Sequence, residues 1–167
     1  MSKNSPAKVT AYYGIMLGVC LVIGYLEAIL PLDLGISGAK LGLTNFLIFF
    51  LLKRNGLTAA LGINLVRILI INILFGSVFS LLYSLLGGIC STLLMYLLLK
   101  LPLGTLGISA AGGAMHNLAQ TLCAAFMLKT PSVLKLLPLL LPIGMVAGIF
   151  CGILSHLLLS RMKKLRL

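Results

Sequence analysis

The polar side chains that could do chemistry in this sequence lie inside long apolar stretches. Arg67 is near the middle of one such stretch, one helical turn after Asn64. Another stretch carries His116, Asn117 and Gln120 near its midpoint, and two of them, His116 and Gln120, are four residues apart and so share a helical face. A charged residue costs roughly 2.5–3.5 kcal/mol at the centre of a membrane helix, so Arg67 should face a partner, a ligand or a water-filled cavity.

The pattern of these groups favours ligand binding. Arg67 and His116 are each about ten residues from a predicted helix end on the same side, which places them at similar depth. Cations and amide donors suit an anionic or polar ligand, such as a phosphate, a carboxylate or an oxygen-rich ring. Glu27, Lys40 and Asn45 are predicted at the outer rim of the same cavity. Two alternatives remain open: Glu27 forms an ion pair with Lys40 or Arg67, and His116 is a core histidine that is satisfied within the protein.

The shortage of acidic residues excludes several kinds of catalysis. Glu27 and Asp33 are the only carboxylates in the sequence, too few for a metal site with several carboxylates or for an acid–base pair on separate helices. No phosphate-binding GxxxxGK[ST] loop occurs, so the chain cannot hydrolyse ATP alone. The four cysteines lie singly in apolar segments and are interpreted as core residues. We therefore predict a protein that is not an enzyme and has neither a bound metal nor a cofactor.

Composition places the chain in a lipid bilayer. Hydrophobic residues make up 60% of its 167 residues and charged residues only 9%, whereas soluble domains carry about 25% charged residues. A membrane-spanning helix needs about 20 apolar residues. The sequence predicts an all-α bundle of six transmembrane helices in a single domain, 1–167, with spans at about 9–30, 36–53, 57–77, 78–100, 105–128 and 136–160.

The second span is short. Only residues 41–52 separate Lys40 from Lys53, about 18 Å at helical rise. A helix that starts near Ile36, with Lys40 reaching outward to the interface, comes close to a full crossing. A re-entrant half-helix is the alternative.

The distribution of basic residues predicts the orientation. The net charge is +11, but the charges lie between apolar stretches, which is typical of membrane topology and not of a nucleic-acid-binding face. With both termini in the cytoplasm, that side would hold nine of the thirteen basic residues, Lys3, Lys8, Lys53, Arg54, Lys100, Arg161, Lys163, Lys164 and Arg166. The outer side would hold Lys40, Lys129 and Lys135. This bias predicts cytoplasmic termini.

Three predicted spans carry small residues at helical spacing, which allows close helix contact in lipid. The last span has Gly144, Gly148 and Gly152; the first has Ala11, Gly14 and Gly18; the fourth has Ser80, Ser84 and Gly88. One interpretation is packing within the bundle. The other is that one stripe, on the first helix, faces a partner membrane protein.

Several longer segments resemble a known family. They are Glu27 with Pro31, the segment GAKLGLTN at 38–45, Arg67 with LFGS at 74–77, SLLGG at 84–88 with Met95, and SAAGGAMHNLAQ at 109–120. Together they resemble the bacterial Gx transporter family, also labelled heptaprenyl diphosphate synthase component I. The resemblance covers about residues 11–161.

The resemblance implies a fold similar to the S components of energy-coupling-factor transporters. Those subunits bind a vitamin-like substrate near the outer side and dock on a membrane coupling protein, which works with ATPases, through small residues of the first helix. Ala11, Gly14 and Gly18 would form that stripe here. The implied function is a ligand-binding subunit in the bacterial cell membrane.

Two alternatives stay open. One is a non-catalytic membrane accessory of heptaprenyl diphosphate or quinone synthesis, or of flavin-linked electron transfer. The other is a structural scaffold whose buried polar groups satisfy one another.

Overall fold

Helices make up the regular structure of the chain. The computed structural model describes residues 5–29 and 42–164. In these residues the elements are α1 (Pro6–Ile29), α2 (Asn45–Asn55), α3 (Leu57–Phe75), α4 (Val78–Leu98), α5 (Thr105–Met127), the 3-10 turn η1 (Pro131–Leu136) and α6 (Leu137–Lys164). The predicted all-helical membrane bundle is confirmed, and all but one of its helices lie within a few residues of the expected bounds.

Among the described residues, four helices are long and apolar enough to cross a membrane: α1, α3, α4 and α6. Helix α5 has 23 residues, enough for a crossing, but it is more polar because it carries His116, Asn117 and Gln120. The chain is therefore a membrane protein in which a polar helix packs among apolar ones.

Helix α2 is a half-helix, so the prediction of one helix over 36–53 is wrong. Residues 42–44 are not helical, and α2 has only 11 residues, about 16 Å at helical rise. Gly42 has a φ of 65°, in the left-handed region, which interrupts any helix that would pass through it. The earlier residues of the predicted span, 36–41, lie outside the described residues.

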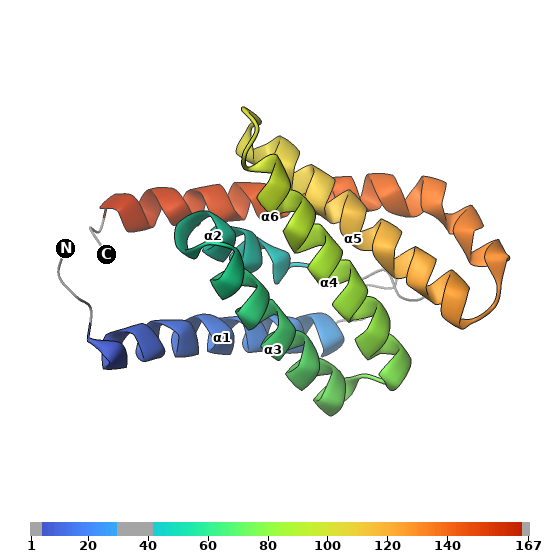
Figure 1. Cartoon of the computed structure of the whole chain (residues 1–167), viewed down its shortest axis with the longest axis horizontal. Coiled ribbons are helices and arrows are strands. Elements are labelled where there is room, and N and C mark those ends of the chain that lie inside the picture. Colours follow the sequence, from blue (N-terminus) through green and yellow to red (C-terminus); the bar gives the residue numbers. More distant parts are fainter. Residues whose placement is uncertain (1–4, 30–41, 165–167) are drawn as a thin grey trace.

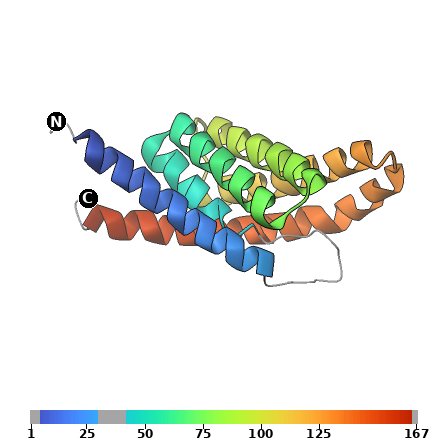
Figure 2. The same ribbon diagram turned by 90° about the horizontal axis from the view of Figure 1, so that it is seen from below.

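The hydrophobic core surrounds this half-helix. Leu47 through Leu52 are all buried, and Phe49 and Phe50 are fully enclosed. Figure 1 shows α1 and α6 along the long axis, with α2 between them and α3, α4 and α5 crossing obliquely. The start of α1 and the end of α6 lie at the same end of the molecule in both views (Figure 2). The start of α2 consequently lies deep in the bundle.

Helices α5 and α6 approach each other at the level of their backbones. A Cβ added to Gly144 would lie 2.6 Å from the carbonyl oxygen of Gly113, and one added to Gly152 would lie 3.0 Å from the Cβ of Ser109. At Gly148 an added Cβ would collide with the carbonyl oxygen of Ser109. The glycine seam of the last span, named here the α5–α6 seam, therefore packs within the chain.

Candidate functional site

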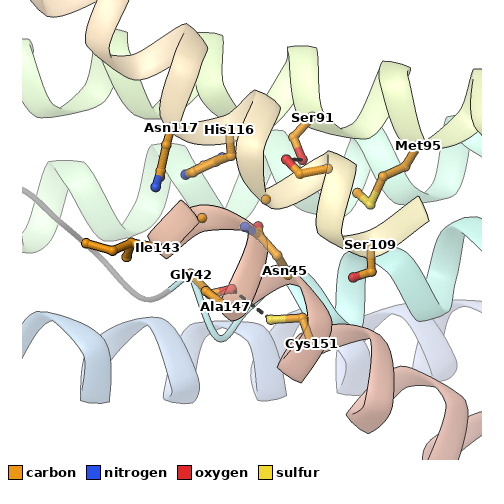
Figure 3. A pocket seen from close by; sticks show the side chains of 14 residues that line it. Gly42, Asn45, Ser91, Met95, Ser109, His116, Asn117, Ile143, Ala147 and Cys151 are labelled. Carbon is orange, nitrogen blue, oxygen red and sulfur yellow. Dashed lines mark hydrogen bonds between the residues drawn. The ribbon is translucent and has the colours of Figure 1, made fainter. Parts of the chain in front are cut away.

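Two adjoining cavities lie beside the start of α2. The arginine cavity, about 520 Å³ with its open mouth, lies between α1, α3, α4 and α5. Its polar lining consists of Glu27, Asn45, Arg67, Asn72, Ser84, His116 and Gln120. The glycine cavity, about 410 Å³ with its mouth, lies between α4, α5 and α6 (Figure 3). Gly42, Asn45 and His116 line both cavities, so the two spaces meet at the start of α2.

Arg67 of α3 lines the arginine cavity with unused hydrogen-bonding capacity. Its Nη2 donates to Oδ1 of Asn64 over 2.6 Å. Its Nε is buried and has no hydrogen-bond partner among the described residues. A guanidinium carries five N–H donors in a rigid fork. A buried donor without a partner costs about 1–3 kcal/mol, so a ligand or water that accepts from Nε would be stabilised there.

Asn64 connects Arg67 to α4 by hydrogen bonds. Its Nδ2 donates to the carbonyl oxygen of Gly88 over 3.2 Å and to Oγ1 of Thr92 over 3.3 Å, while its Oδ1 accepts from Arg67. The side chain is 1% exposed and lines neither cavity. Asn64 was predicted to bind ligand, but its contacts make it the residue that anchors Arg67 to α4.

Glu27 of α1 is bound to the start of α2. One carboxylate oxygen accepts from the hydroxyl of Thr44 over 2.8 Å, and the other accepts from the backbone N–H of Leu43. The negative charge therefore stabilises the positive N-terminal end of α2. Glu27 also interacts electrostatically with Arg67, which lines the same cavity. Lys40, predicted at this rim, lies outside the described residues.

Close contact between α4 and α5 places the polar residues of α5. A Cβ added to Gly87 would lie 2.7 Å from Cγ of Gln120 and 3.1 Å from Nδ1 of His116. Gln120 lines the arginine cavity, and His116, 9% exposed, lies between the two cavities. The structure thus brings together side chains from α1, α2, α3 and α5 that are predicted from the sequence to lie either at similar depth or at the outer rim of the same cavity.

Asn117 contacts α6. Its Nδ2 donates to the carbonyl oxygen of Leu140 over 2.7 Å. Asn117 lines the glycine cavity, where Figure 3 shows it beside His116. Its amide therefore supports the α5–α6 contact and is not one of the groups in the arginine cavity.

Asn72 and Ser84 line the arginine cavity but were not among the predicted site residues. Asn72 donates from Nδ2 to the carbonyl oxygen of Ile68 over 2.8 Å, and its Oδ1 is buried without a partner in the described part of the chain. The sequence could have indicated Asn72 as a site residue by its position, eight residues after Asn64 on the same helical face. Ser84 was noticed only as a small residue of the fourth span.

A thiol closes the glycine cavity toward α2. Sγ of Cys151 lies 3.5 Å from the carbonyl oxygen of Gly42, as the dashed line in Figure 3 shows. On the opposite side, the hydroxyl of Ser91 donates to the carbonyl oxygen of Gly112 over 2.8 Å. Within residues 5–29 and 42–164 no three His, Cys, Asp or Glu side chains group closely enough to hold a metal ion.

Both cavities are narrow in this conformation. The space that water can enter is enough for only a few molecules. A larger ligand would therefore require the surrounding helices to separate.

The small-residue stripe of α1 is open. Ala11, Gly14 and Gly18 are exposed, and a Cβ added to either glycine would meet nothing within 4 Å. Apolar side chains flank the stripe, with Ile15 62% and Val22 60% exposed. This face of α1 contacts neither α3 nor any other described helix closely.

Comparison with known families identifies the chain. The family model described as heptaprenyl diphosphate synthase component I matches residues 16–158. The chain belongs to this family. No curated protein and no solved structure matches it. The match includes every described residue of the arginine cavity, so the cavity lies within the part of the chain that defines this component I family.

Proposed function

We propose that the chain is the substrate-binding membrane subunit of a transporter related to the energy-coupling-factor type. It binds a small anionic or polar ligand in the arginine cavity and does no chemistry on it. The observation that carries this proposal is a cavity lined by polar groups from several helices, among them Arg67, whose buried Nε has no hydrogen-bond partner in the described part of the chain. A bundle that needed only internal packing would gain nothing from a cation held there, because burying it is costly.

The surrounding contacts support a binding role for Arg67. Asn64 fixes the guanidinium from the side of α4, so the side chain loses little further freedom when a ligand arrives. Gln120 and Asn45 add amide groups that both donate and accept. The narrow cavity represents a closed state, and ligand entry requires an opening of the bundle.

A non-catalytic role agrees with the carboxylate count. Prenyl transfer ionises an allylic diphosphate held by Mg²⁺, a hard cation that takes oxygen ligands, often from aspartates. The whole sequence has two acidic residues, and one of them, Glu27, is occupied at the start of α2. Energy for transport would come from a membrane coupling protein and ATPases that dock on the open stripe of α1. The Lys/Arg bias favours a bacterial cell membrane with both termini in the cytoplasm.

Retention of ligand by a variant at Arg67 tests the proposal. The full chain is purified in mild detergent, and native mass spectrometry measures the bound small molecule. We expect Arg67→Ala to insert and purify normally but to lose the ligand. Arg161→Ala is the matched control, since Arg161 is exposed near the end of α6, and it should retain ligand. Equal retention by Arg67→Ala and wild type would reject the assignment.

The family description favours a second candidate, a membrane accessory of a prenyl diphosphate synthase. The term component I implies a partner component. Co-purification from the native host separates the two functions. Recovery with an ATPase and a coupling protein supports transport. Recovery with a soluble prenyltransferase or a flavoprotein supports the accessory role.

A further inference from the structure

The arginine cavity is balanced in charge. Among the described residues that line it, Arg67 is the one cation and Glu27 the one anion. The other polar lining groups are amides, a hydroxyl and the imidazole of His116. Both charged residues line this one cavity. With His counted as neutral, the formal charges of the described lining residues therefore cancel.

The start of α2, where Asn45 lines the cavity, is a positive helix end. Glu27 already occupies this end through Leu43 and Thr44. A net charge on the ligand would have no opposite charge left to compensate it, and a buried uncompensated charge is strongly unfavourable. Asp33 and Lys40 lie outside the described residues.

We propose that the ligand carries no net charge: it is an uncharged polar molecule or a zwitterion. An acceptor group of the ligand faces Arg67, and a donor group faces Glu27 and Asn72, because all three residues line the cavity. This inference rests on the proposed binding function and narrows its ligand class. It disfavours a diphosphate, because that group would bring two or more negative charges to one guanidinium.

Three probes of one shape test the charge preference: benzamide is neutral, benzoate is an anion and benzamidinium is a cation. Saturation-transfer NMR on the purified full chain in nanodiscs measures the affinity of each. We expect the wild type to bind benzamide at least tenfold more tightly than either ion. Benzamide presents both the acceptor and the donor that the cavity requires, and neither ion is balanced there.

Two variants should change the charge preference of the cavity, one toward an anion and the other toward a cation. Glu27→Gln leaves Arg67 uncompensated, so benzoate should gain at least tenfold over benzamide. Arg67→Gln leaves Glu27 uncompensated, so benzamidinium should gain by a similar factor. Gln at position 27 keeps an acceptor for the N–H of Leu43, but the variant weakens the contact with α2; if it does not fold, Arg67→Gln and the wild type still decide the question.

Specific outcomes overturn the inference. Tighter binding of benzoate than benzamide by the wild type, or displacement of benzamide by inorganic diphosphate, would show that the cavity accepts net negative charge. That result would leave the binding function standing. If the wild type binds none of the probes and carries no co-purified molecule, the proposed function fails together with the inference.

Discussion

Helices α1 and α6 both carry small residues three or four positions apart, but their surroundings differ. On α6, Gly144 and Gly148 touch the backbone of α5 so closely that an added Cβ would collide with it. On α1, Gly14 and Gly18 have nothing within 4 Å of an added Cβ. The same sequence pattern therefore marks a contact already made in one helix and an unused surface in the other. Small residues show where a helix can be approached, and only the structure shows whether a neighbour is present.

The largest effect should come from filling the α5–α6 seam. Gly113→Ala adds a Cβ that would collide with the carbonyl oxygen of Gly144, so we expect a loss of about 3 kcal/mol or more in stability. Thermal unfolding in detergent measures it. Gly107→Ala on the same helix is the control, since nothing lies within 4 Å of its added Cβ, and it should be neutral or stabilising. Equal stability of the two variants would mean that the seam is not closely packed.

Filling the α1 stripe should instead affect the partner. Gly18→Leu has open space around it and improves helix propensity, so the fold should be unchanged or slightly more stable. We expect co-purification with the coupling protein to fall at least tenfold. Gly62→Leu on α3 is the matched control, because Gly62 is equally exposed and open. A partner lost with both variants, or with neither, would argue against docking on α1.

A smaller effect should follow from loss of a polar contact across the seam. Asn117→Ala removes the bond from Nδ2 to the carbonyl oxygen of Leu140, so we expect a loss of about 1–2 kcal/mol. Unfolding measurements compare it with Thr121→Val, whose lost hydroxyl bonds only within α5. If Asn117→Ala costs as much as Gly113→Ala, the polar contact and not the backbone approach holds α5 to α6.

The smallest effect on stability should come from a contact near the N-terminal end of α1. The hydroxyl of Tyr12 donates to Oδ1 of Asn55 over 3.0 Å, one of the contacts that hold the sparsely packed α1 to the end of α2. Tyr12→Phe should cost about 0.5–1 kcal/mol. Tyr25→Phe keeps its ring contact with Phe75 and should change stability by less than about 0.5 kcal/mol. A larger loss from Tyr25→Phe would place the main tie of α1 at its other end.

The sequence predicts well what depends on local periodicity and on depth. Arg67, His116 and Gln120 were placed together because each lies at the middle of an apolar stretch, and they do line one cavity. The prediction of where α2 starts was wrong, because that start depends on Gly42 in a left-handed conformation. It also depends on Glu27, which lies sixteen residues before Leu43 and stabilises the start of the helix. The supporting role of Asn64 also depends on α4, whose facing carbonyl at Gly88 is a tertiary feature. The periodicity of one helix does not show which other helix it contacts.

The labelling rate of the Cys151 thiol can report how often the site opens. It is 3% exposed and lies against the carbonyl oxygen of Gly42, at the junction where the two cavities meet. A maleimide reagent can reach it only while α2 and α6 are apart, so its labelling rate is proportional to the fraction of time that the junction is open. An occupant of the cavities slows that rate. Because Cys20, Cys90 and Cys123 are also free thiols, mass spectrometry must measure the labelling at Cys151 itself. Opening of the site can then be timed without an engineered label.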